Sequence, residues 1–221
     1  MDQAPPATEM KSPSPIHVGA ILFPQFELLD LYGPLELFGL LEQGVKITVV
    51  AEKAGPVRSS VGPGGMAEAT LADAKGFDVL LIPGGIGTRK EISNAPFMAE
   101  LKRLAETSKT VATVCTGSLL LARTGLLNGR QATTNKRVFQ LITNYAPKVN
   151  WVAKARWVED GKYFTSSGVS AGMDMALAVI AKLFGREKSL LVAGRAEYEW
   201  HEDSSTDPFA FQPQSSLKID G

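Results

Sequence analysis

The sequence predicts an α/β protein: a mostly parallel sheet sandwiched by helices, with a small β-hairpin. Short apolar runs alternate with helical patterns along the chain, and three of the four main runs are almost continuously apolar, as in strands covered on both faces. The 221 residues, 44% of them hydrophobic, suffice for one substantial core but are short for two ordinary domains. We therefore expect one domain over residues 16–198, with tails at 1–15 and 199–221.

The predicted strands are the apolar runs at residues 16–23, 45–51, 77–83 and 110–114. The predicted helices lie at about residues 30–42, 91–107, 116–124, 137–145 and 170–184. Between two strand-like pieces in residues 151–167, the pair Asp160-Gly161 predicts a hairpin. Gly125 and Gly185 stand where helices end with a glycine cap.

The two tails follow different patterns. Residues 1–15 are polar and rich in proline, so they cannot bury enough apolar surface to offset their ordering entropy, and we expect disorder. After Glu197 the helical pattern fails. We expect this C-terminal segment to pack through Trp200 and Phe209, whose rings either cover the core or line a pocket.

Composition excludes several function classes. Lys+Arg and Asp+Glu both total 23, which leaves no excess charge for nucleic acid or an anionic membrane surface. One cysteine and two histidines provide neither a disulfide framework nor a zinc cluster, so we expect a reducing compartment and no metal. No long apolar run or signal-like N-terminus is present, and a cytoplasmic location is predicted.

The segment TVATVCTGSLLLARTG is the most informative part of the chain. A β-branched strand runs directly into Cys115, and Thr116-Gly117-Ser118 then opens an apolar helix. Such a turn exposes a side chain at the carboxyl end of the sheet, where open α/β folds bind their ligands. The neighbouring helix N-terminus favours a thiolate. The alternative is an inert, buried cysteine.

Two further turns carry candidate residues. Gly84-Gly85 ends a strand, and its amides, together with that of Thr116, can form an oxyanion hole; the alternative is a tight turn between strand and helix. Asp30 stands just before a helix with Pro34 in its first turns. It is either a helix N-cap or a carboxylate delivered beside Cys115 as proton donor and acceptor.

Five other residues have plainer interpretations. His201 in His201-Glu202-Asp203 imitates the last part of a Cys-His-acid triad, but it lies in the polar tail, and we expect a solvated or capping histidine. His17 inside the first strand is expected to pack. Ser170 is expected to cap the long helix, and Lys136 and Arg137 to form a solvated pair.

Together these segments resemble the ThiJ/PfpI superfamily over residues 16–198, and within it the isocyanide (isonitrile) hydratase branch. The resemblance rests on LLDLYGP (28–34), IPGGIGT (82–88), VCTGSLLLARTGLLNGRQATTN (114–135) and SSGVSAGMDMAL (166–177). It implies a flavodoxin-like fold close to that of class I glutamine amidotransferases. It also implies a homodimer acting on a small-molecule substrate without a cofactor.

The resemblance also implies roles for individual residues. Cys115 matches the family nucleophile, Asp30 the carboxylate and Thr116 the residue after the nucleophile. The segments around Gly84, Gly85, Asn135 and Gly168 would then bind the substrate or its oxyanion.

Asn135 stands where many relatives have a histidine, so a Cys-His pair is absent there and peptidase activity is disfavoured. Asn135 cannot exchange a proton near neutral pH, which leaves proton transfer to Asp30. The implied reaction converts an isocyanide to an N-formyl amine through a thioimidate on Cys115. Glyoxalase- or deglycase-like chemistry, a biosynthetic reaction on another small electrophile, and a cysteine redox sensor remain alternatives.

Overall fold

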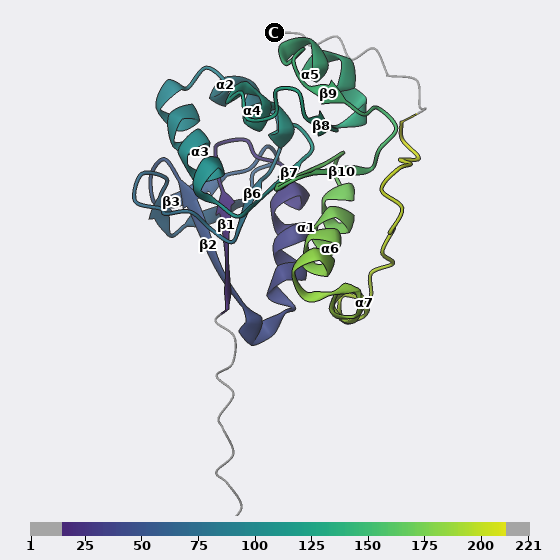
Figure 1. Ribbon diagram of the computed structural model, residues 1–221. Coiled ribbons are helices and arrows are strands. Elements are labelled where there is room, and N and C mark those ends of the chain that lie inside the picture. The colour runs from purple at the N-terminus through teal and green to yellow at the C-terminus, as the bar shows by residue number, and fades with distance from the viewer. Residues whose placement is uncertain (1–14, 211–221) are drawn as a thin grey trace, which may run out of the picture.

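The computed structural model describes residues 15–210, and a seven-stranded sheet lies at its centre between two layers of helices (Figure 1). In spatial order the strands are β10 (Trp157–Asp160), β11 (Tyr163–Ser166), β7 (Thr110–Val114), β6 (Val79–Ile82), β1 (Ile16–Ile21), β2 (Val45–Ala51) and β5 (Ala69–Thr70). Only the β10–β11 pair is antiparallel within this sheet, which confirms the predicted mostly parallel arrangement. Apart from Pro15, the predicted disordered tail lies outside the described residues, as does the end of the C-terminal tail.

Helices cover both faces of this sheet (Figure 1). One layer contains α1 (Leu28–Gly39), α6 (Ala171–Phe184) and α7 (Arg186–Arg195), and the other contains α2 (Thr88–Glu91), α3 (Ala95–Thr107) and α4 (Gly117–Arg123). The remaining elements are η1 (Glu42–Gly44), the hairpin β3 (Gly55–Arg58)–β4 (Gly64–Ala67), β8 (Gln131–Ala132), η2 (Lys136–Val138), α5 (Phe139–Tyr145) and β9 (Asn150–Trp151). No sequence pattern predicted α7, because it buries mainly the small residues Ser189, Val192 and Ala193 and so lacks an apolar stripe.

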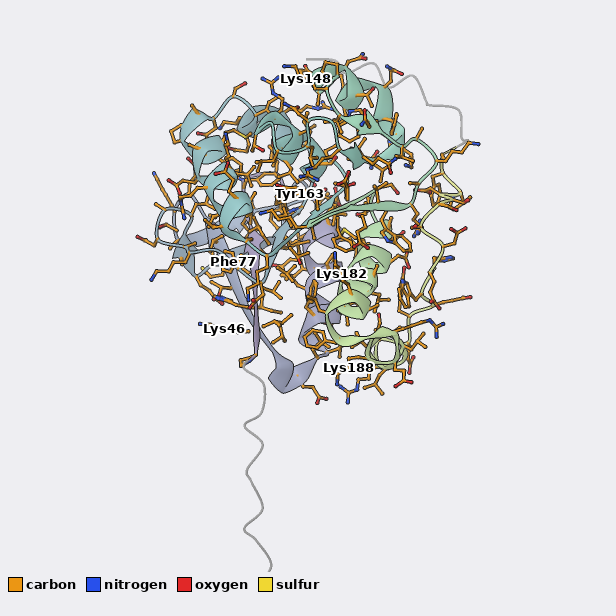
Figure 2. The ribbon with its side chains drawn as sticks, viewed as in Figure 1. Lys46, Phe77, Lys148, Tyr163, Lys182 and Lys188 are labelled. Carbon is orange, nitrogen blue, oxygen red and sulfur yellow. The ribbon has the colours of Figure 1, made fainter. Side chains whose placement is uncertain are left out.

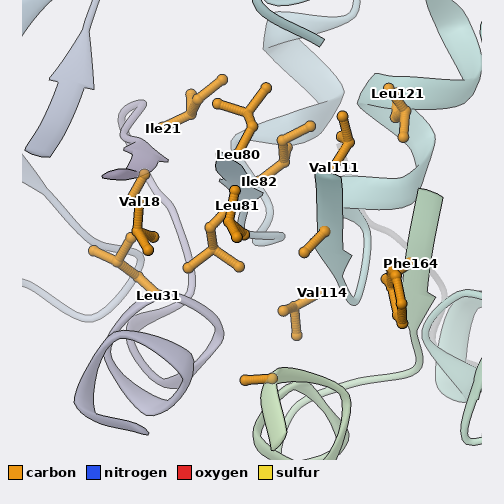
Figure 3. Close-up of a cluster of buried hydrophobic side chains, with 14 of the residues drawn as sticks. Val18, Ile21, Leu31, Leu80, Leu81, Ile82, Val111, Val114, Leu121 and Phe164 are labelled. Atoms are coloured by element: carbon orange, nitrogen blue, oxygen red, sulfur yellow. The ribbon is translucent and has the colours of Figure 1, made fainter. Parts of the chain in front are cut away.

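The core explains why the apolar runs became central strands. Every residue of β6 and β7 is buried, since helices pack against both faces. Figure 3 shows side chains of β6 and β7 between Leu31 of α1 and Leu121 of α4. Lys46, Lys148 and Lys188 project from the periphery, whereas Phe77 lies inside the body (Figure 2). The sheet is thus held rigidly from both sides.

The predicted turns are largely confirmed. Gly161, at φ 64°, closes the hairpin between β10 and β11, and Gly185 ends α6 at φ 89°. In the C-terminal segment Trp200 packs against the core and its Nε1 donates to the Asp174 carbonyl at 3.1 Å. Phe209, by contrast, is 50% exposed and lines a surface pocket together with Trp200, so it does not cover the core.

No helix within residues 15–210 has both the length and the apolar character needed to cross a lipid bilayer.

Candidate active site

Four neighbouring parallel strands bring the candidate residues together. In the sheet β11, β7, β6 and β1 lie side by side, and their carboxyl ends share one edge. β7 is followed by Cys115, β6 by Gly84, and β11 by residues 167–168, while the chain leaving β1 leads into α1 and Asp30. This edge is where α/β sheets bind ligands, which is why segments distant in sequence meet there.

Cys115 occupies a sharp turn between β7 and α4. Its φ is 56°, in the left-handed region that residues other than glycine rarely adopt. Its N–H lies 3.2 Å from the carbonyl oxygens of both Ser166 and Ser167, and its own carbonyl accepts from Thr134 Oγ1 at 3.1 Å. These bonds fix the turn, and only 6% of Cys115 is exposed.

Asp30 is fully buried within the first turn of α1, whose N-cap is Glu27. Asp30 Oδ2 accepts the Gly84 amide at 3.0 Å, while Oδ1 has no hydrogen-bond partner among the described residues. The carboxyl therefore does not cap the helix. Burial raises the pKa of Asp30 to about 8, with a smaller rise from the charge of Glu27, while the Gly84 bond acts in the opposite direction.

The thiol of Cys115 is also held in its protonated form. Burial raises its pKa well above the ordinary value, and the nearby charge of Asp30 raises it further. The Thr116 amide and Asn135, whose Nδ2 lies 3.1 Å from Sγ, lower it by less. The amide at the helix N-terminus thus favours the thiolate as expected, but burial acts more strongly in the opposite direction.

The Gly84 and Gly85 amides have partners inside the protein. Gly84 N–H donates to Asp30, and Gly85 N–H donates to Thr116 Oγ1 at 3.0 Å, while that hydroxyl donates to the Gly85 carbonyl at 3.1 Å. A Cβ at Gly84 would lie 2.6 Å from Thr116 N and 2.8 Å from Asp30 Oδ2. The predicted oxyanion role of these two amides is therefore not available in this arrangement. Instead they join the Asp30 helix to the Cys115 turn.

A cavity of about 430 Å³ opens beside Cys115. Thr116, Asn135, Gly85 and Val169 line it next to the thiol. Gly168 has no room for a side chain, since a Cβ there would lie 2.9 Å from Cys115 Sγ and would collide with Asn135 Nδ2. The close approach of this backbone to the thiol gives Gly168 a reason to be glycine.

Neither histidine of the chain lines this cavity. His201 is exposed in the C-terminal segment, where its backbone N–H donates to Asp174 Oδ1, as expected of a residue outside any triad. His17 Nε2 lies 2.8 Å from Thr48 Oγ1, and its ring packs edge-on against Phe77.

Two expectations near the site are corrected. Lys136 is buried rather than solvated, and its Nζ donates to Thr133 Oγ1 at 2.7 Å and to the Ala155 carbonyl at 2.6 Å. Arg137 is exposed and lines the cavity. Ser170 precedes α6 but makes no capping bond through its side chain.

A buried polar network lies behind Cys115 that the sequence did not predict. Arg156 Nε donates to Asp174 Oδ2 at 2.7 Å, and Arg156 Nη1 lies 3.8 Å from Asp207 Oδ1. Asp207 also accepts from the hydroxyl of Ser167, whose carbonyl receives the Cys115 N–H. No local signal predicts this network, because its members lie in separate segments of the chain.

These features define an α/β protein with a cysteine on a strained turn between strand and helix, beside a buried carboxyl group. The chain belongs to the DJ-1/PfpI family, whose model matches residues 17–182. It is 34% identical over 184 residues to the isonitrile hydratase of Pseudomonas putida, covering 83% of this chain and 78% of that protein. It is 29% identical over 159 residues to protein dj-1beta of Drosophila melanogaster, covering 70% of this chain and 83% of that protein.

A solved structure supports the same assignment. The ThiJ/PfpI family protein from Pseudomonas syringae superposes with a TM-score of 0.78 at 30% identity, covering 89% of this chain and 82% of that one. The predicted flavodoxin-like fold is therefore confirmed.

Proposed function

We propose that this protein hydrates an isocyanide to an N-formyl amine, with Cys115 as nucleophile and Asp30 as the group that transfers protons. The observation that carries the proposal is the Cys115 thiol lining the cavity with the buried Asp30 carboxyl group beside it, and with no histidine among the lining residues. The similarity to the Pseudomonas putida isonitrile hydratase supports the choice of substrate.

The reaction starts when the Cys115–Asp30 pair carries a single proton, with the thiol protonated and the carboxylate ionised. Asp30 accepts the thiol proton as Sγ bonds to the terminal isocyanide carbon, and then returns that proton to the carbon, which gives a thioimidate. Asp30 next accepts a proton from an attacking water and transfers it to nitrogen. As the adduct collapses, the C=O bond forms and the C–S bond breaks, and Asp30 transfers the hydroxyl proton to sulfur, which releases the N-formyl amine and restores the thiol.

Asp30 suits this role because burial has moved its pKa to about 8, close to the operating pH. Its unpartnered Oδ1 can bond to the reacting groups, while the Gly84 amide fixes Oδ2. Asn135 and the Thr116 amide, which both lower the pKa of the thiol, stabilise negative charge on sulfur.

To test the proposal, purified protein is incubated with benzyl isocyanide and, separately, with methylglyoxal, and the products are measured. We expect N-formylbenzylamine by mass spectrometry and no lactate above the background. Cys115→Ala should abolish the product while leaving the circular dichroism spectrum and melting temperature close to those of the parent. Turnover of methylglyoxal alone, or product formation by Cys115→Ala, would contradict the proposal.

A further inference from the structure

The rim of the cavity carries two exposed arginines. Arg89 on α2 and Arg137 in η2 both line the cavity and are exposed. Within residues 15–210 neither guanidinium makes a hydrogen bond or ion pair, whereas Arg130, Arg156 and Arg186 each bind a carboxylate. Two free guanidinium groups at one opening provide a binding place for an anion.

The interior of the same cavity is apolar. Leu119 and Ile142 are buried and therefore lie deep in it, while Ile92 and Leu141 are partly buried. Tyr145, 48% exposed, adds an aromatic side chain at the rim. A cavity of about 430 Å³ with this lining holds a compact hydrocarbon body rather than a polar one.

One carboxylate also lines the cavity, but it belongs to the catalytic end. Glu27 precedes α1, its amide donates to the Gly84 carbonyl at 2.9 Å, and its charge acts on Asp30. Positive charge thus prevails on α2 and η2, and negative charge lies close to the reacting groups.

We infer that the substrate has a reactive group at Cys115, an apolar body along the cavity and a carboxylate that binds Arg89 and Arg137 at the rim. If the protein is the proposed hydratase, its substrates are isocyanides that carry a carboxylate. The isocyanide part of this inference rests on the proposed function. The carboxylate subsite itself rests only on the cavity.

The first arm compares 4-(isocyanomethyl)benzoate with its methyl ester, which keeps the body but removes the charge. We expect a higher kcat/KM for the benzoate. The ratio of kcat/KM for the benzoate to that for the ester should fall about fivefold in Arg89→Gln, and by a similar factor in the separate variant Arg137→Gln. This is the change expected from loss of an exposed ion pair of about 1 kcal/mol. Arg58→Gln, an exposed arginine outside the cavity lining, is the matched control and should keep the ratio.

The second arm separates this inference from the proposed function. Binding of 4-propylbenzoate and of neutral 4-propylbenzyl alcohol to Cys115→Ser protein is measured by calorimetry, with no reaction involved. We expect tighter binding of the benzoate, weakened in both arginine variants and by added salt. If neither isocyanide reacts but this pattern holds, the reaction is wrong and the subsite stands. Equal binding of the two probes, or none, overturns the subsite whatever the activity.

Discussion

Asp30→Asn should stop catalysis and yet stabilise the protein. Asparagine keeps the size of the side chain and the bond from Gly84 N–H, but it cannot exchange protons, so turnover should fall by about 10²- to 10⁴-fold. A carboxyl whose pKa is raised from 3.8 to about 8 on folding weakens the folded state as pH rises between these values. Asp30→Asn has no carboxyl at this position, so its free energy of unfolding does not carry this pH-dependent loss.

The sign follows from proton binding. Between the two pKa values the folded protein holds a proton on Asp30 that the unfolded chain has lost, so the free energy of unfolding decreases as pH rises. At 1.36 kcal/mol per pH unit, the parent should lose roughly 4 kcal/mol between pH 5 and pH 8.5 relative to Asp30→Asn. Groups common to both proteins cancel in this difference.

The assay is urea denaturation of both proteins at pH 5 and pH 8.5, with activity measured on the same samples. Asp174→Asn is the matched control, since Asp174 is an equally buried aspartate but is paired with Arg156. Breaking that pair should destabilise by about 3–5 kcal/mol. If Asp30→Asn is less stable than the parent at pH 8.5, or the gap does not grow with pH, Asp30 is not a carboxyl held protonated by burial.

Three other predictions follow from the same geometry. The parent's kcat/KM should rise through about pH 8, as the Cys115–Asp30 pair loses its first proton. Asn135→Ala should reduce the rate modestly and leave this pH dependence in place. If the pH dependence disappears in Asn135→Ala, proton transfer does not rest on Asp30 alone. Gly168→Ala should reduce kcat at least tenfold with a normal fold by circular dichroism, because its Cβ has no room beside Cys115 Sγ; an unchanged kcat would contradict this crowding. Sedimentation should give the mass of two chains at micromolar concentration, with exposed Leu29 and Tyr32 of α1 near the contact, and a 23.7 kDa species would refute the dimer.

The sequence predicted the parts of the site that depend on strand ends. Apolar runs locate β1, β6 and β7, and parallel strands share their carboxyl edge, so the Asp30 segment, Gly84 and Cys115 were expected together. Hydrogen-bond partners were harder to predict. Whether the Gly84 amide faces a substrate or Asp30 depends on the packing of α1 against that edge, which no local pattern encodes.

Burial was the other source of error. Lys136 beside Arg137 has the sequence appearance of a solvated pair, yet its neighbours Thr133 and Ala155 enclose the ammonium. The pKa of the Cys115 thiol likewise does not follow the rule for a cysteine at a helix N-terminus, because burial raises it. In both cases the surroundings, which come from distant segments, decide the electrostatics.

The hydrogen bond from the Ser167 hydroxyl to Asp207 connects the C-terminal segment to the turn that carries Cys115. The family model ends at residue 182, so the aspartate that holds the backbone behind Cys115 comes from outside the matched region. The hold on that turn therefore depends on a segment that the family model does not include. Replacing the C-terminal segment of this protein therefore alters the support of the turn that carries Cys115.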